Sequence, residues 1–165
     1  MWVLAVVLVE EVRKKAFEYT KEIFSWAELD SDGDITFEFQ STKVWIDVVK
    51  MARPDATKIK EFVAEHQLPT TLVRIRAVLV ADVPRSPALF QYVATDSRRN
   101  LGSINVVLDD EGTCDLFFMY TLAGDEITPG ELKHAAFIVA TVANQLDDDV
   151  QQKFGGKRWT EIKEK

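Results

Sequence analysis

The sequence of 165 residues has a net charge of −7 at pH 7, with 47% hydrophobic and 28% charged residues. This balance is typical of a globular protein and excludes a largely disordered chain. The acidic character argues against nucleic-acid binding, which depends on lysine and arginine at phosphates. Cys114 is the only cysteine, so no intrachain disulfide can form. We expect a cytoplasmic protein with a single domain at 1–158 and a tail at 159–165.

The chain begins with an apolar run, from Trp2 to Val9, that is too short for a membrane span of about 20 residues. It lacks a basic segment and a cleavage site, so a signal peptide is not indicated and no membrane partner is expected. The run is the start of a helix or an added strand, docked on the core or on a second subunit. From Val9 to Ile23, apolar residues three or four positions apart predict a helix.

Two strands that form a hairpin are predicted next. The segments 35–40 and 44–49 alternate between apolar and polar residues on either side of Ser41-Thr42, which is the pattern of half-buried strands. A short helix over 55–66 is expected between strands, because Pro54-Asp55 can start a helix and apolar residues follow on one side.

The longest predicted strand covers 72–82. Ser86-Pro87 then favours a helix over 87–97, because serine can cap free backbone N–H groups and proline has none to satisfy at the first helical position. Strands over 103–108 and 113–120 flank a turn rich in aspartate and glycine, which predicts a second hairpin.

A long helix completes the predicted fold. Thr128-Pro129-Gly130-Glu131 has the residues of a capping box, an apolar stripe runs from Leu132 to Val150, and Gly155-Gly156 ends the helix. The element order α-β-β-(α)-β-α-β-β-α suits an α+β fold, in which an antiparallel five-stranded sheet carries its helices mainly on one face.

The second face of this sheet has a mixed composition. If the cleanly apolar rows of the strands face the helices, the opposite rows place aromatic residues, methionine and valine among charged residues. A monomer rarely exposes a large apolar patch, so these residues form a partner-binding surface, or the N-terminal segment or another helix covers them. The predicted partner-binding residues are Trp45, Val49, Arg74, Arg76, Val78, Val107, Phe117 and Met119.

The segment ELDSDGDITFEF, residues 28–39, raises the question of calcium binding. Asp30, Asp32 and Asp34 alternate around Gly33 as in an EF-hand loop. However, Phe39 stands where the EF-hand needs a bidentate glutamate, and a predicted strand follows where it needs a helix. A simple helix-to-strand turn is favoured. A calcium-responsive regulator that uses the 28–38 loop is the alternative function.

No pattern in the sequence indicates catalysis. Cys114 lies on the apolar side of a predicted strand, where a thiol acts as a small hydrophobe. His66 and His134 lie in separate helical segments without a zinc-type partner. Nucleotide-binding glycine motifs and a nucleophile elbow are absent from the sequence. We therefore expect no enzyme, no cofactor and no metal site.

Four stretches carry a resemblance to a known family: STKVWIDV, LVRIRAVLVADVPRSPALFQYV, DDEGTCDLFFMYTLAGDEITPGEL and ANQLDDDVQQKFGG. Over about residues 9–158 the chain resembles the actinobacterial YbjN-like domains, which are grouped with type III secretion chaperones as peptide-binding chaperones. The most specific pieces lie at 124–132 and 145–156. The resemblance implies an α+β fold with antiparallel strands, an acidic and often dimeric protein, and no catalytic residues.

Together, the residues and the resemblance predict a non-enzymatic chaperone-like or adaptor domain. We expect a cytoplasmic homodimer that binds an apolar peptide or protein segment. An exposed strand edge would add a strand of the client by backbone hydrogen bonding, and Trp45, Phe117 and Met119 would accept its side chains.

Overall fold

The computed structural model describes residues 2–54, 56–95 and 101–162 of the chain. Its strands form one antiparallel sheet in the order β1-β2-β3-β4-β6-β5. The strands are β1 (Glu28–Leu29), β2 (Ile35–Phe39), β3 (Thr42–Lys50), β4 (Thr71–Pro84), β5 (Ser103–Leu108) and β6 (Thr113–Ala123). The helices are α1 (Trp2–Lys21), α2 (Thr57–Glu65), α3 (Pro87–Thr95), α4 (Pro129–Phe154) and α5 (Trp159–Ile162).

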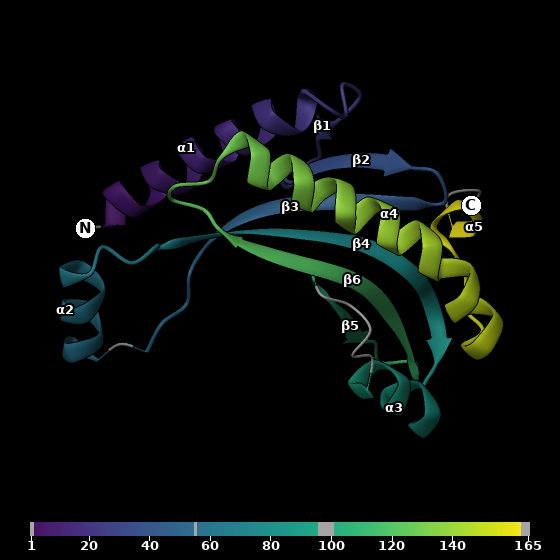
Figure 1. Cartoon of the computed structure of the whole chain (residues 1–165). Coiled ribbons are helices and arrows are strands. Elements are labelled where there is room, and N and C mark those ends of the chain that lie inside the picture. Colours follow the sequence, from purple (N-terminus) through teal and green to yellow (C-terminus); the bar gives the residue numbers. More distant parts are fainter. Residues whose placement is uncertain (1, 55, 96–100, 163–165) are drawn as a thin grey trace.

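Helices α1 and α4 lie across one face of the sheet (Figure 1). The strands turn their apolar rows toward these helices, and burial of each large aliphatic or aromatic side chain contributes about 1.5–3 kcal/mol to stability. The predicted α+β fold, with an antiparallel sheet and helices mainly on one face, is confirmed. Fully buried members of the core are Val12, Ala16, Ile35, Ile46, Ile75, Leu116, Phe118, Leu132 and Val139.

The sheet has six strands, so the predicted number of five is wrong. The additional strand, β1, forms at the start of the segment that the sequence analysis interpreted as a turn. Its two residues pair with Thr36 and Ile35 of β2, and the Asp30 N–H donates to the Asp34 carbonyl at 2.9 Å to close the turn. Two residues are too few to display alternation, so periodicity could not reveal this strand.

The predicted start of α3 and both predicted ends of α4 are confirmed, whereas α2 begins at Thr57 rather than at residue 55. The predicted end of α3 at residue 97 lies outside the described residues. At the start of α4, Thr128 Oγ1 accepts the Glu131 N–H at 3.3 Å, and the Glu131 carboxylate accepts the Thr128 N–H at 3.1 Å. This is a complete capping box. Ser86 caps α3 by accepting the Leu89 N–H at 3.1 Å. Gly155 ends α4.

Helix α1 begins at Trp2, so the helical alternative for the apolar N-terminal run is confirmed. Leu8 and Val9 pack against the core. The predicted apolar stripe is wrong at Ile23, which is exposed because the helix has already ended at Lys21. No helix in the described part of the chain is long and apolar enough to cross a membrane.

The three remaining helices lie at the margins of the sheet (Figure 1). Helix α2 sits at the end where β3 leaves the sheet and β4 enters it, and none of its residues is buried. Helix α3 contacts the end of α4, with the Tyr92 and Phe154 rings 5.2 Å apart. Helix α5 forms within the segment expected to be a tail, after a backbone bridge between Lys157 and Ala81 of β4. The domain limit at residue 158 stays a prediction.

Candidate functional site

The residues predicted to bind a partner share the face of the sheet opposite α1 and α4, which we call the open face. The strand register places Trp45 of β3 beside Arg76 of β4, and Arg76 beside Met119 of β6. Val78 lies beside Phe117 in the next row. Strand pairing therefore brings the central members of the predicted set together.

Two predicted residues lie at the margins of the open face. Val107 is on the edge strand β5, opposite Asp115, and is 54% exposed. Val49 lies near the end of β3, opposite Leu72. Val78 is buried rather than accessible, whereas Trp45, Phe117 and Met119 are half-buried. The alternative that the N-terminal segment covers this face is wrong, because α1 lies beside α4 on the other side.

Trp45 is the centre of an aromatic cluster on the open face. Its ring lies 6.4 Å from Phe117 and 5.7 Å from Trp159, both edge to face. The Lys43 ammonium lies 5.1 Å from the Trp45 ring and 5.2 Å from the Trp159 ring, and the Arg76 guanidinium lies 5.9 Å from Trp45. Such edge-to-face and cation–π contacts hold the ring in place while leaving part of it exposed.

Sequence reasoning missed Trp159, because it assigned this residue to the tail. In the structure the Trp159 indole N–H donates to the Glu38 carboxylate at 3.4 Å, and the ring extends the aromatic cluster. A tryptophan in a mostly charged and polar segment was the available indication, since large aromatic side chains are seldom left in a solvated tail.

Two arginines of the open face are paired with carboxylates of the same chain. Arg74 donates to Asp47, with its Nε at 2.8 Å, and Arg76 lies 3.3 Å from Asp34. Burial, followed by the charges of Asp47 and Asp30, raises the pKa of Asp34 above its usual value in spite of Arg76. These pairs hold the guanidinium groups of both arginines, and the strand register places Arg76 between Trp45 and Met119.

The acidic segment 28–38 comprises β1, most of β2 and, at residues 30–34, the turn between them. One carboxylate oxygen of Asp30 accepts the N–H groups of Asp32 and Asp34, each at 3.0 Å, and Gly33 has a φ of +83°. The Asp34 side chain is turned toward Arg76. Among the described residues, no group of three or more potential metal ligands is found. The calcium alternative gains no support from this geometry.

The cysteine and the described histidines are not assembled into a reactive site. Cys114 is buried, and burial raises the pKa of its thiol, so the reactive thiolate is disfavoured. His66 packs on Phe62 at the end of α2, with the ring centres 4.2 Å apart. His134 is exposed on α4.

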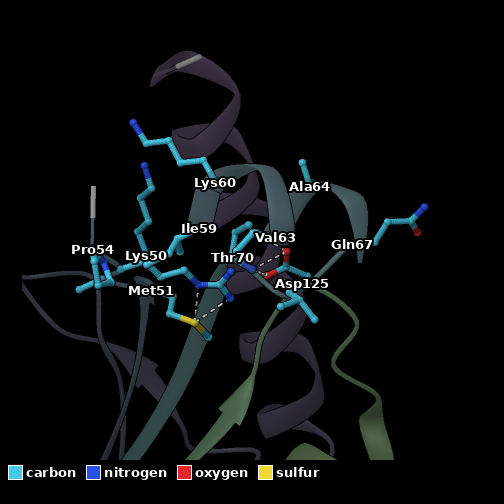
Figure 2. Close-up of a pocket in the computed structure, with 13 residues that line it drawn as sticks. Lys50, Met51, Pro54, Ile59, Lys60, Val63, Ala64, Gln67, Thr70 and Asp125 are labelled. Carbon is cyan, nitrogen blue, oxygen red and sulfur yellow. Dashed lines mark hydrogen bonds between the residues drawn. The ribbon is translucent and has the colours of Figure 1, made fainter. Parts of the chain in front are cut away.

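A groove that the sequence did not predict lies between α2 and the adjoining ends of β3 and β4 (Figure 2). Its volume is about 930 Å³, near the upper end of the usual range for small-ligand pockets. Apolar side chains of α2, including Ile59 and Val63, line one wall. Met51 and Arg53, from the segment after β3, and Asp125, from the loop before α4, also line the groove. Figure 2 shows Met51 and Asp125 among the lining side chains.

Asp125, in the loop before α4, connects this loop to the start of β4 by hydrogen bonds. Its carboxylate accepts the N–H groups and hydroxyls of both Thr70 and Thr71, at 2.6–3.0 Å. Burial alone would raise the pKa of Asp125, but these hydrogen bonds outweigh it and hold the pKa below the usual value of 3.8. The acidic group is therefore structural, and its charge is already satisfied.

Asp125→Asn is expected to lower the free energy of unfolding by about 1–3 kcal/mol at neutral pH, because an amide cannot accept all of these hydrogen bonds. The folded-state pKa lies below the usual 3.8, so the carboxylate stabilises the fold above that pH, and this contribution is lost as the pH falls through the folded-state pKa. Urea denaturation of both proteins should show their difference shrinking in this acidic range. Asp110→Asn, in the exposed β5–β6 turn, is the control, and a pH-independent difference would contradict the assignment.

Comparisons with known proteins agree with this architecture. The family model for the T3SS (YopN, CesT) and YbjN peptide-binding chaperone 1 matches residues 61–162. The crystal structure of the ExsC–ExsE complex contains a chain with a TM-score of 0.53 and 14% identity, covering 85% of this chain and 93% of that one. The crystal structure of YbjN, a transcription regulator candidate from E. coli, has a TM-score of 0.53 and 10% identity, covering 86% and 93%. At these identities the likeness shows the fold. No curated protein matches the sequence significantly.

Proposed function

Because the chain belongs to the family of T3SS and YbjN peptide-binding chaperones, we propose that it is a non-enzymatic chaperone-like domain that holds an apolar peptide or protein segment on its open face. The family assignment confirms the resemblance predicted from the sequence; the actinobacterial branch stays a prediction. A chain of similar fold occurs in the ExsC–ExsE complex, which supports a protein or peptide as the client.

The observation that carries the proposal is the half-exposed aromatic and methionine cluster of the open face. Trp45 lies on β3, and Phe117 and Met119 lie on β6; β4 pairs with both strands and lies between them. All three residues belong to the open face, on the other side of the sheet from α1 and α4. Aromatic and methionine side chains offer large contact areas and adapt to varied apolar partners. A surface that must accept extended segments of different sequence needs these properties.

The edge strand β5 is the expected site for an added client strand. Ser103–Leu108 contains no charged residue and no proline, so it lacks the usual features that protect an edge from pairing. At the other edge β1 has only two residues, and the Trp26 indole N–H donates to the Glu38 carbonyl of β2 at 3.0 Å. A strand added to β5 would lie next to Val107, at the margin of the open face.

The remaining parts of the proposal concern assembly and location. We propose a homodimer in the cytoplasm, as the sequence and its resemblance predicted. Light scattering on the purified full chain measures the assembly: a mass of twice 18.7 kDa is expected, and a monomer at all accessible concentrations would remove the dimer from the proposal.

The test of the open face is the double variant Phe117→Ser with Met119→Ser. It should reduce client capture in a quantitative pull-down at least about tenfold, because two apolar contacts of more than 1 kcal/mol each are removed. Both side chains are only half-buried, so the melting temperature should change little. The matched control is Ile23→Ser with Phe137→Ser, which removes exposed apolar residues outside the open face. Equal capture by the two double variants would overturn the proposal.

A further inference from the structure

Helix α2 does not bury its apolar side, although its sequence is amphipathic. Ile59 and Val63 face the groove, Phe62 is 55% exposed, and no residue of the helix is buried. A surface helix normally seats such a stripe on the core. Here Ile59 and Val63 of this stripe line a cavity of about 930 Å³ (Figure 2). The groove is large enough for several side chains of a bound peptide.

Arg53 gives the groove a cation that lacks a carboxylate partner among the described residues. Its Nε and one terminal nitrogen lie 3.1 and 3.0 Å from the Met51 sulfur, a weak acceptor, and the same terminal nitrogen also donates to the Pro69 carbonyl. The other terminal nitrogen is buried without an acceptor. By contrast, every other arginine in the described part of the chain has a carboxylate partner: Arg13, Arg74, Arg76, Arg85 and Arg158.

The charge of the groove favours an acidic ligand. The one described carboxylate in the lining, Asp125, is saturated by hydrogen bonds from Thr70 and Thr71. It is therefore not available to Arg53, whose guanidinium has no carboxylate partner in the described part of the chain. A guanidinium binds a carboxylate through two parallel hydrogen bonds, which neither a thioether nor a single carbonyl can match.

We propose that this groove binds a client segment in which a carboxylate lies beside apolar side chains. The carboxylate pairs with Arg53, and the apolar side chains lie against Ile59 and Val63. Val49 of the open face and Lys50 of the groove lining are consecutive residues of β3, so their side chains point to opposite faces of the sheet. The groove is therefore a second contact site near the end of β3, distinct from the open face. This inference rests on the proposed function and specifies the chemistry of its client.

Methionine methyl groups separate the two sites experimentally. The chain has three methionines, Met1, Met51 and Met119; Met51 lines the groove and Met119 lies on the open face. With ¹³C-methyl-labelled full-length protein, short acetylated peptides with leucine- and phenylalanine-rich cores flanked by aspartate are titrated against identical peptides flanked by asparagine. The chemical shift of the Met51 methyl group should report an affinity for the aspartate peptides at least about tenfold higher than for the asparagine peptides. A tenfold difference corresponds to the contribution of one charge-assisted hydrogen bond.

Variants test the role of Arg53. Arg53→Gln should remove the preference for aspartate peptides that Met51 reports and leave the Met119 response unchanged. Arg53→Lys should retain part of the preference for aspartate, because lysine keeps the positive charge. Arg13→Gln, on α1, is the matched control and should behave as the unaltered protein. Unchanged spectra of the free variants outside the groove establish that they fold.

Each other outcome decides against the inference. If Met119 shifts and Met51 does not, the groove is not a client site, while the proposed function stands. If aspartate and asparagine peptides bind equally at Met51, the carboxylate is not recognised. A Met51 signal that changes with protein concentration and ignores peptide would assign the groove to a second copy of the chain. If neither methionine responds to any peptide, both the inference and the proposed function fail for apolar peptides.

Discussion

Gly124→Ala is expected to lower the free energy of unfolding by about 2–4 kcal/mol, through overpacking and the loss of a buried hydrogen bond. A Cβ at residue 124 would lie 2.3 Å from the Thr71 hydroxyl oxygen. Thr71 is buried and its hydroxyl donates to Asp125 at 2.6 Å, so it cannot turn away without losing that bond. The substitution must therefore disturb the corner where β4 begins beside the groove.

Gly130→Ala is the matched control, because a Cβ at residue 130 would have no atom within 4 Å. Its stability should stay within about 0.5 kcal/mol of the unaltered protein. Urea denaturation of both variants measures the difference, and equal stabilities would show that the close contact at residue 124 is not needed. The Met51 methyl signal should also move in Gly124→Ala, since Met51 N–H donates to the Thr70 carbonyl at this corner.

The helices and strands with regular periodicity could be predicted because each depends on local information. Alternation around Ile46 identified β3, and the Thr128 capping box fixed the start of α4. The apolar rows also identified the helix-covered face. The apolar rows were less informative at the edge strand: Leu108 belongs to the apolar row of β5 but is exposed, because β5 is the last strand of the sheet in the described part of the chain.

The features that could not be predicted depend on contacts between distant parts of the chain. Trp159 joins the open face only because Lys157 bridges to Ala81 and turns the chain back across β4. The same turn brings Gly156 so near that a Cβ there would lie 2.5 Å from the Ala81 carbonyl oxygen. The segments 124–132 and 145–156, which carried the family resemblance, thus include glycines at close backbone approaches.

The groove illustrates a further limit of periodicity. The spacing of Ile59 and Val63 predicts that α2 has an apolar side, but not whether that side is seated on the sheet. This depends on the path of the connections from β3 and to β4, which hold α2 at the margin (Figure 1). Helical periodicity therefore predicted the helix and not the cavity beside it.

Arg74→Met is expected to destabilise the fold by about 2–4 kcal/mol, because it leaves the Asp47 carboxylate without its ion-pair partner. The Asp47 side chain is only 6% exposed, and one of its oxygens already lacks a hydrogen-bond partner. The other oxygen accepts from Arg74. The loss of stability in Arg74→Met should be smaller than for a fully buried ion pair, because the Arg74 side chain is 43% exposed and solvent screens its charge.

The double variant Asp47→Val with Arg74→Met separates the structural role of the pair from client binding. Replacing a whole ion pair by apolar residues is often neutral, so stability should recover most of the loss seen in Arg74→Met alone. If the Arg74 charge also contacts the client, the double variant will fold normally and still bind acidic peptides less well at Met119. Unchanged binding in this stable background would restrict Arg74 to holding Asp47, and the open face would then select its client through Trp45, Phe117 and Met119.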